Sequence, residues 1–185
     1  MSDGSDDGEA FVGKLTQKAI LFGPGEDVLV CRVDDHWEPP GGTFEYGETL
    51  VGGLRRELRE ELSVDARVGP PVGATYGGWV DDAGEPMVTL LYRCRTDERD
   101  VALNDEHDDH AWVAPETARE RLGGWLGGRG RRVLDRALAL DGEGPFEPRA
   151  DPYEGTDVDT DELLASLAEA RRTSAAELRD EDGQE

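Results

Sequence analysis

The sequence contains very little lysine, since Lys14 and Lys18 are the only lysines among its 20 basic residues. Against these stand 43 acidic residues, which give a formal net charge of −23 at pH 7. Proteins that bind nucleic acids generally present a basic surface that neutralises phosphates. The charge balance therefore argues against general nucleic-acid binding.

Cysteines and long apolar runs are also scarce. Cys31 and Cys94 each lie in a predicted strand, with no metal-binding or nucleophile pattern nearby, so we expect two buried free thiols. No apolar run approaches the roughly 18 residues of a membrane span. Residues 1–10 are acidic and lack the apolar core of a signal peptide. These absences predict a cytoplasmic protein without membrane contact.

The acidic, lysine-poor composition resembles that of haloarchaeal proteins, which work in concentrated salt. Molar salt shortens the Debye length to about 3 Å and so screens the repulsion within a highly charged chain. The alternative is an ordinary protein with acidic tails. Because acidic residues also cover the middle of this chain, we favour the halophilic interpretation.

The segment over residues 41–64 joins a glycine-containing loop to a predicted helix over residues 49–62. At about 100° per residue, Glu57, Glu60 and Glu61 fall on one face of this helix. Close carboxylates repel one another, and Mg²⁺ or Mn²⁺ would relieve the repulsion because both prefer hard oxygen ligands. The alternative is a solvated acidic face. A separate apolar stripe consists of Val51, Leu54, Leu58 and Leu62.

This segment resembles the Nudix box, G-x5-E-x7-R-E-U-x-E-E-x-G-U, in which U is aliphatic. The preceding WEPPGG, residues 37–42, is similar to the W-x-x-P-G-G that often leads into the box. One position departs: Ser63 stands where the box has its last glycine. A serine held there with positive φ would cost about 1 kcal/mol, which leaves the helix end open. The matching residues are Gly42, Glu48, Arg56, Glu57, Leu58, Glu60, Glu61 and Val64.

The resemblance implies an α/β fold, the Nudix α/β/α sandwich with a mixed β-sheet, over residues 11–140. It also implies an enzyme that uses Mg²⁺ or Mn²⁺ to cleave the diphosphate linkage of a nucleoside diphosphate-X compound, a nucleotide or nucleotide sugar. A catalytically silent Nudix-like binding module is the alternative. An isoprenoid-diphosphate isomerase shares the fold but needs a catalytic cysteine, and both cysteines here lie within strands.

The resemblance further assigns roles to individual residues. Glu48 would join the metal ligands or steady the junction of loop and helix. The general base would be a box glutamate or Glu106 in a later loop. The implied metal ligands are Glu57, Glu60, Glu61 and Glu48. The implied catalytic residues are Glu57, Glu60, Arg56 and Glu106, and the implied substrate-binding residues are Gly41, Gly42 and Trp79.

Several aromatic and histidine side chains have a simpler interpretation. Phe44, Tyr76 and Trp79 could stack on a base, although core packing is the usual role of such residues. We expect His36 to be exposed, and His107 and His110 to be loop and strand residues rather than metal ligands.

The remaining pattern predicts the order of elements. The glycine-rich run over residues 123–130 lacks the Lys-Ser/Thr of a P-loop, so we expect a turn between two helices and not a phosphate cradle. Expected strands cover residues 11–22, in one or two pieces, 27–33, 67–80, 87–95 and 110–113. Expected turns and loops cover residues 23–25, 34–38, 81–85 and 96–105, and further helices begin at Pro115 and cover residues 131–140.

The two ends of the chain differ in composition from this domain. Residues 1–10 are expected to form a disordered acidic tail, and residues 141–159 an acidic linker rich in proline and glycine. An amphipathic helix is predicted over residues 160–178, within the last segment 160–185. It could dock on the domain or on a second subunit, which leaves a homodimer open.

The charge balance predicts a strong dependence of stability on salt. We expect the melting temperature to rise as KCl is raised from about 0.1 M to about 1 M, because screening weakens the repulsion within the folded chain. Sucrose at equal osmolality is the control, since it does not screen charge. Equal melting temperatures at the two KCl concentrations would refute the halophilic interpretation.

Overall fold

A computed structural model describes residues 12–80, 86–126 and 128–142. The predicted tail over residues 1–10, the turn over residues 81–85 and the helix over residues 160–178 lie outside these ranges. The elements in chain order are β1 (Lys14–Phe22), β2 (Val28–Val33), β3 (His36–Glu38), α1 (Leu50–Leu62), β4 (Arg67–Val80), β5 (Pro86–Arg95), β6 (Asp109–Val113), α2 (Pro115–Leu126) and α3 (Gly128–Gly142).

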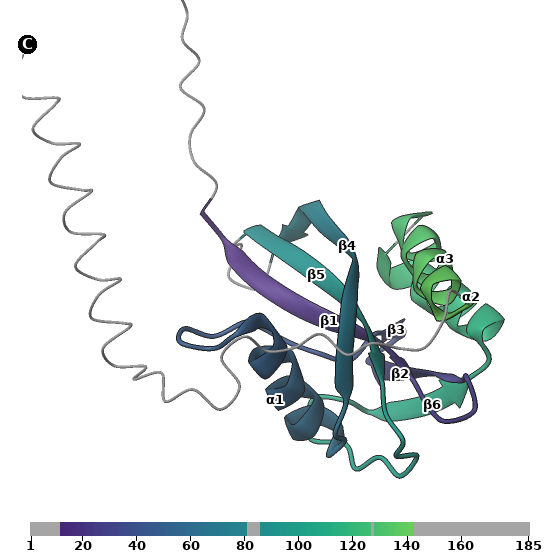
Figure 1. Cartoon of the computed structure of the whole chain (residues 1–185). Helices are drawn as coiled ribbons and strands as arrows, with labels where there is room; N and C mark the ends of the chain where they lie inside the picture. Colours follow the sequence, from purple (N-terminus) through teal and green to yellow (C-terminus); the bar gives the residue numbers. More distant parts are fainter. Residues whose placement is uncertain (1–11, 81–85, 127, 143–185) are drawn as a thin grey trace, which may run out of the picture.

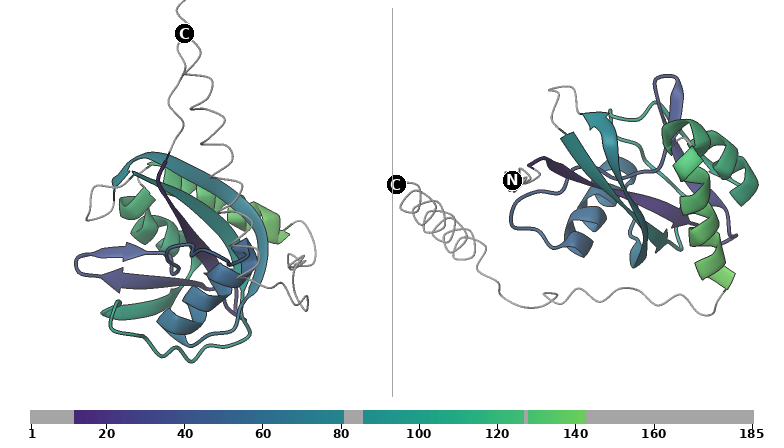
Figure 2. Two further views of the ribbon diagram at one scale, coloured as in Figure 1. Left: turned by 90° about the vertical axis from the view of Figure 1, so that its left-hand side faces the viewer. Right: turned by 90° about the horizontal axis from the view of Figure 1, so that it is seen from above.

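The strands form one mixed sheet in the order β3-β2-β1-β5-β4, with β6 pairing β2. Strand β1 lies in the middle, parallel to β5 and antiparallel to β2. Helix α1 lies on one side of the sheet, and α2 and α3 lie on the other (Figures 1 and 2). This is the predicted α/β/α sandwich with a mixed β-sheet.

Alternation along β1 explains why the sheet has helices on both faces. Ala19 and Leu21 pack with the apolar stripe of α1, whereas Ile20 and Phe22 pack with α2 and α3. Successive side chains of a strand point to opposite faces, so one strand contributes to two cores. All four are essentially inaccessible to solvent.

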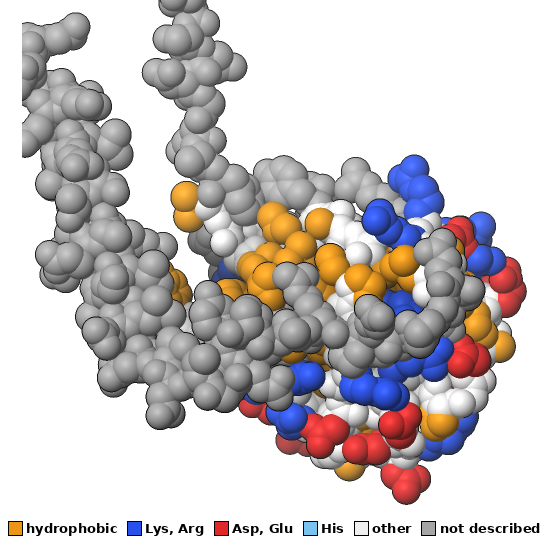
Figure 3. All heavy atoms as spheres, viewed as in Figure 1, with side chains coloured by type: hydrophobic (Ala, Val, Ile, Leu, Met, Phe, Trp, Pro, Cys, Tyr) orange, Lys and Arg blue, Asp and Glu red, His pale blue; other side chains and the backbone are white. Residues whose placement is uncertain are grey.

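Acidic and basic side chains lie intermixed on the face shown in Figure 3, beneath a group of hydrophobic side chains. Two of the ion pairs of the domain are Arg59 with Asp65, at 2.6 Å, and Arg67 with Asp97, at 3.0 Å. Among the described residues, no helix is both long and apolar enough to cross a membrane.

Two predictions of local structure were wrong. Residues 36–38, expected to lie in a loop, form β3 because their backbone pairs with the end of β2. The turn expected over residues 123–130 is mostly helix, because α2 continues to Leu126 and α3 begins at Gly128. Burial of Leu122 and Trp125 against the sheet offsets the cost of about 1 kcal/mol for each glycine inside α2. Helix α3 also extends beyond the predicted residues 131–140.

The box helix begins where the pattern predicted. The Thr49 side chain caps it by accepting a hydrogen bond of 2.9 Å from the Gly52 N–H. Gly53, expected only to weaken the first turns, has a packing role. A Cβ there would lie 2.7 Å from Glu48 Oε2 and 3.1 Å from Gln17 Oε1, so a larger residue would displace the ends of these two side chains.

The serine that departs from the Nudix box ends the helix in a left-handed conformation. Ser63 has φ 56° and ψ 35°, and its N–H donates to the Arg59 carbonyl at 2.9 Å. This geometry favours glycine, because a side chain with positive φ costs about 1 kcal/mol. The helix therefore ends as a glycine-terminated helix would, with some strain at Ser63.

Ser63→Gly is expected to raise the free energy of unfolding by about 0.5–1 kcal/mol, because it removes this strain at an exposed position. Chemical denaturation of the two proteins in the same salt measures the difference. Ser63→Ala is the matched control, since alanine keeps the Cβ and should give no gain. Equal stability of Ser63→Gly and wild type would contradict the assignment of strain.

Candidate functional site

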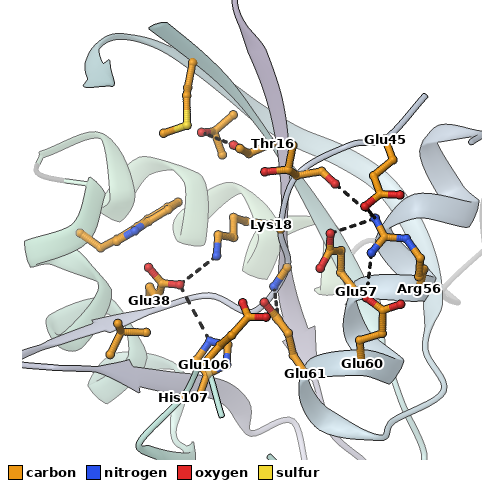
Figure 4. A pocket seen from close by; sticks show the side chains of 17 residues that line it. Thr16, Lys18, Glu38, Glu45, Arg56, Glu57, Glu60, Glu61, Glu106 and His107 are labelled. Carbon is orange, nitrogen blue, oxygen red and sulfur yellow. Dashed lines mark hydrogen bonds and ion pairs between the residues drawn. The ribbon is translucent and has the colours of Figure 1, made fainter. Parts of the chain in front are cut away.

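An open cavity of about 590 Å³ lies between the box helix and the loop that precedes β6. Figure 4 shows its side chains, most of which come from β1, the box loop, α1 and the 96–108 loop, with others from β2, β3, β5 and α2. The structure brings together in its wall these predicted site residues: Gly41, Gly42, Arg56, Glu57, Glu60, Glu61 and Glu106. The box loop and the box helix therefore meet the loop before β6, which is distant from them in sequence, at one place.

The three box carboxylates lie at different depths. Glu61 is buried, with 3% of its surface exposed. The Glu57 side chain is 14% exposed and that of Glu60 is 57% exposed. All three share a helix face, as predicted, but the face runs from the protein interior at Glu61 to solvent at Glu60.

Arg56 holds the outer part of this cluster together. Its guanidinium donates to Glu48 at 2.5 Å, to Glu60 at 2.8 Å and to Glu57 at 3.0 Å. It also donates to the Thr43 carbonyl at 3.3 Å. A planar group with several fixed donors can bind several carboxylates together, whereas a lysine would act as a point charge. Arg56 thus links the box loop to α1.

Glu48 is placed differently from the other predicted metal ligands. It lies outside the wall of the main cavity, in a neighbouring depression that also contains Phe44. Burial raises the pKa of Glu48, but hydrogen bonds from Arg56 and from the Glu45 N–H outweigh this effect and lower it. Glu48 is therefore an ionised partner of Arg56 at the junction of loop and helix.

The buried end of the cluster is fixed by the loop backbone. The Gly41 N–H donates to Glu61 Oε2 at 2.7 Å. Gly41 has φ 121°, and a Cβ there would lie 2.3 Å from the Gln17 carbonyl oxygen. Only glycine fits this conformation and approach, which explains why the loop can reach the Glu61 carboxyl.

Burial raises the pKa of Glu61 to about 7, because the charged form is poorly solvated there. Lys18 and the Gly41 N–H oppose the shift, whereas Glu106 and Glu38 add to it. Burial also raises the pKa of Glu57, although Arg56 opposes it. The negative charges of Glu57 and Glu61 are thus unfavourable in the protein alone, and a bound cation would stabilise them.

The loop that contains Glu106 is anchored to the end of α1. The N–H groups of Ala102 and Asn104 donate to the carbonyls of Leu62 and Glu61, at 3.0 Å and 3.1 Å. Asn104 also hydrogen-bonds to Glu106 at 3.3 Å. Glu106 is exposed at the rim of the cavity, with its carboxylate near Glu61 (Figure 4).

Sequence reasoning missed the opposite wall, which contains Lys18, Glu38 and His107. Lys18 Nζ donates to Glu38 Oε1 at 2.9 Å, and His107 Nε2 lies 3.9 Å from the same oxygen. His107 lies in the loop before β6, as expected, but its side chain is buried. One signal in the sequence was available: Lys18 directly precedes the apolar end of its strand, residues 19–22, and lysine is rarely buried without a partner.

Of the other aromatic and histidine predictions, Phe44, His36 and His110 lie outside this wall. Trp79 lies in β4, and its side chain is not among those described. His110 lies in β6, where its backbone pairs with that of Cys31. His36 is half exposed and lies 3.5 Å from Glu38 Oε2.

The donor set fits a divalent cation. Carboxylate oxygens are the ligands that Mg²⁺ and Mn²⁺ prefer, and a cation would relieve the repulsion and poor solvation of Glu57 and Glu61. Within the described ranges, the acidic, histidine and cysteine side chains are not yet gathered into a closed ligand set. Glu57 and Glu60 turn toward Arg56 instead, so an ion would take over contacts that Arg56 now makes.

Glu61→Gln is expected to stabilise the metal-free protein by about 1–3 kcal/mol above pH 7. Its pKa is about 7 in the folded protein, against an ordinary value of 4.5. The folded state therefore binds more protons between these values, and stability falls as pH rises from about 4.5 to about 7. Denaturation at several pH values in EDTA should show this decline in wild type and its loss in the variant.

Glu60→Gln is the matched control for that experiment, because Glu60 lies on the same helix but is mostly exposed. It should change stability little and leave the pH dependence intact. If Glu61→Gln destabilises the protein at pH 8, the buried carboxylate is not under the predicted electrostatic penalty.

Comparison with known proteins identifies the family. The NUDIX domain family matches this chain over residues 15–131. Nucleoside triphosphatase NudI from Salmonella arizonae is 33% identical over 103 residues, which cover 48% of this chain and 73% of the relative.

Solved structures agree with this match. The E. coli ORF135 protein is 25% identical with a TM-score of 0.54, over 72% of this chain and 94% of its own. MutT protein from Methanosarcina mazei Go1, at 21% identity, shares the fold with a TM-score of 0.58, over 70% of this chain and 96% of its own. The matched region contains the whole carboxylate cavity, and the chain belongs to the Nudix hydrolase family.

Proposed function

We propose that this protein hydrolyses the diphosphate linkage of a nucleoside diphosphate-X compound with the help of Mg²⁺ or Mn²⁺. The observation that carries the proposal is the meeting of the buried Glu61, the mostly buried Glu57 and the Gly41–Gly42 loop in one cavity. A polyphosphate brings negative charge into an acidic cavity, and divalent cations can bind to both.

Glu57, Glu60 and Glu61 would hold the cation or cations. When bound, such ions neutralise the phosphate oxygens and lower the pKa of a coordinated water. Arg56 would orient Glu57 and Glu60 through the contacts described above, and Glu48 would hold Arg56 in turn rather than bind metal. Glycines 41 and 42 allow the loop backbone to come close to the substrate.

Glu106 is our candidate for the general base. It is exposed at the rim of the cavity, on a loop fixed to α1, and its carboxylate faces the box carboxylates (Figure 4). A base must lie within reach of the water that it deprotonates. A box glutamate is the alternative, and the variants below separate the two.

Nucleoside triphosphates are the first substrates to test, because the relative from Salmonella arizonae is named a nucleoside triphosphatase. An isoprenoid-diphosphate isomerase is disfavoured because it needs an accessible thiol. Cys31 and Cys94 are fully buried, and burial raises the pKa of Cys94 to about 12. A silent binding module would fold in the same way and is distinguished by the absence of turnover.

The first experiment is a hydrolysis screen in molar KCl with Mg²⁺ or Mn²⁺, using nucleoside triphosphates, nucleotide sugars, ADP-ribose and dinucleoside polyphosphates. We expect turnover of at least one substrate class, and its abolition by EDTA. A folded protein that binds Mg²⁺ but turns over none of them would support the binding module instead.

Variants then test the assigned roles. Glu57→Gln and Glu61→Gln should each lower kcat at least about a hundredfold, because each removes a charged metal ligand. Glu106→Gln should lower kcat by about a hundredfold or more if it is the base, and an unchanged rate would assign that role to a box glutamate. Glu98→Gln, exposed and outside the cavity, should retain the wild-type rate. Near-wild-type rates for Glu61→Gln in saturating Mg²⁺ would refute the metal assignment.

A further inference from the structure

The wall opposite the box carboxylates is a polar cluster built from three separate elements. Lys18 comes from β1, Glu38 from β3, and His107 from the loop before β6. Glu38 Oε1 lies between the other two, 2.9 Å from Lys18 Nζ and 3.9 Å from His107 Nε2 (Figure 4). All three side chains line the same cavity as Glu57 and Glu61.

His107 is the least satisfied member of this cluster. Its side chain is 2% exposed, and neither ring nitrogen has a hydrogen-bond partner among the described residues. The distance of 3.9 Å to Glu38 is too long for a hydrogen bond. A buried polar group without a partner is unfavourable, so such groups usually meet water or a ligand. This imidazole lies in the wall of a cavity that a ligand can enter.

The cluster is close to neutral, in contrast to the acidic wall opposite. The Lys18 ammonium is paired with the Glu38 carboxylate. Burial lowers the pKa of His107, and nearby Lys18 lowers it further, which favours the neutral imidazole. A neutral imidazole has one donor and one acceptor, and the ammonium has three donors, of which Glu38 takes one.

An aromatic ring lies beside these polar groups. Lys18 Nζ lies 6.0 Å from the centroid of the Trp125 ring, which also lines the cavity. Val33 and Met87 add apolar surface to the same lining. Apolar walls with a few donors and acceptors are typical of sites that bind small organic groups.

We propose that Lys18, Glu38 and His107 form the subsite that recognises the uncharged, hydrogen-bonding part of the substrate, either the edge of a nucleobase or the hydroxyls of a sugar. This inference rests on the proposed function and extends it from the diphosphate to the group attached to it. A further phosphate fits this wall less well, because Glu38 already neutralises Lys18 and the cavity contains several other carboxylates. The cluster therefore sets which substrate binds, while the box carboxylates act on the diphosphate.

The chain offers matched pairs of variants for a test. Lys18→Met is compared with Lys14→Met, the same change at the other lysine of β1, which lies outside the cavity wall. His107→Leu is compared with His110→Leu in β6. Circular dichroism and thermal melting in molar KCl establish that each variant folds.

The kinetic test measures kcat and KM for the common ribonucleoside triphosphates, which differ in the base, and for the 2′-deoxy forms, which differ in the sugar. Loss of one hydrogen bond to a buried group changes discrimination by about tenfold or more. We expect Lys18→Met and His107→Leu to reduce the preference of wild type for its best substrate by at least about tenfold, mainly through KM. The two control variants should keep the preference. If the variants lose preference among the four bases, the cluster recognises the nucleobase. If they lose preference between ribose and deoxyribose, it recognises the sugar.

Two kinetic results would overturn the proposal. One is an equal loss for every substrate, which would indicate a purely structural role or contact with the diphosphate. The other is a substrate preference that Lys18→Met and His107→Leu leave unchanged. A wild type that shows no preference among these substrates would count in the same way. If a second histidine variant is needed because His107→Leu does not fold, His107→Gln keeps a polar side chain and should still alter the preference.

If wild type turns over no substrate, the proposed function is refuted. A binding measurement then tests separately whether the cluster recognises a nucleoside. Nucleosides without phosphate, at millimolar concentration in EDTA, are added to isotope-labelled protein, and the imidazole signals are followed by NMR. The His107 signals, assigned from their loss in the variant, should shift while those of His110 do not. Unmoved His107 signals with every nucleoside would overturn the inference in that case.

Discussion

The site depends on how one arginine is shared among carboxylates that would otherwise repel one another. Arg56 donates to Glu48, Glu57 and Glu60 and to the Thr43 carbonyl, so one guanidinium joins the box loop to the second half of α1. Hydrogen bonds to Glu48 raise the pKa of Arg56 despite partial burial, so its charge is permanent. The same guanidinium contacts both Glu57 and Glu60, and so offsets the repulsion between them.

The inner half of the cluster lies under a different constraint. Glu61 is buried against the Gly41 backbone, and the nearest cation on the far side is Lys18, which is already engaged by Glu38. The metal-free protein therefore contains a carboxyl group whose charge is poorly compensated. Such local instability is common where a protein is arranged for a ligand, because the ligand supplies the missing charge. The same residue thus links the stability of the fold to its proposed chemistry.

The sequence predicted the parts of this site that are local. The spacing of Glu57, Glu60 and Glu61 on one helix and the glycine of the loop at position 41 follow from periodicity and backbone sterics. The helix end at Ser63 also has a local cause. The fold followed from the alternation of apolar residues in the strands and from the resemblance of one motif to a family.

The parts that sequence reasoning missed depend on contacts between distant segments. Lys18, Glu38 and His107 come from three elements, and nothing in their local sequence indicates that they share a wall. Strand β3 forms only because β2 is available to pair with it. Helix α2 passes through two glycines because Trp125 is buried against the sheet, and local propensity cannot include that burial.

The central claim, that the buried box carboxylates form a cation site, is tested most directly by counting protons released on Mn²⁺ binding. Calorimetric titrations at pH 7 in buffers of different ionisation enthalpy give this number. Because the pKa of Glu61 is about 7 in the metal-free protein, the account predicts release of about half a proton per protein. It also predicts weaker binding and no release for Glu61→Gln. Mn²⁺ binding of equal strength and equal proton release in both proteins would show that the ion binds elsewhere.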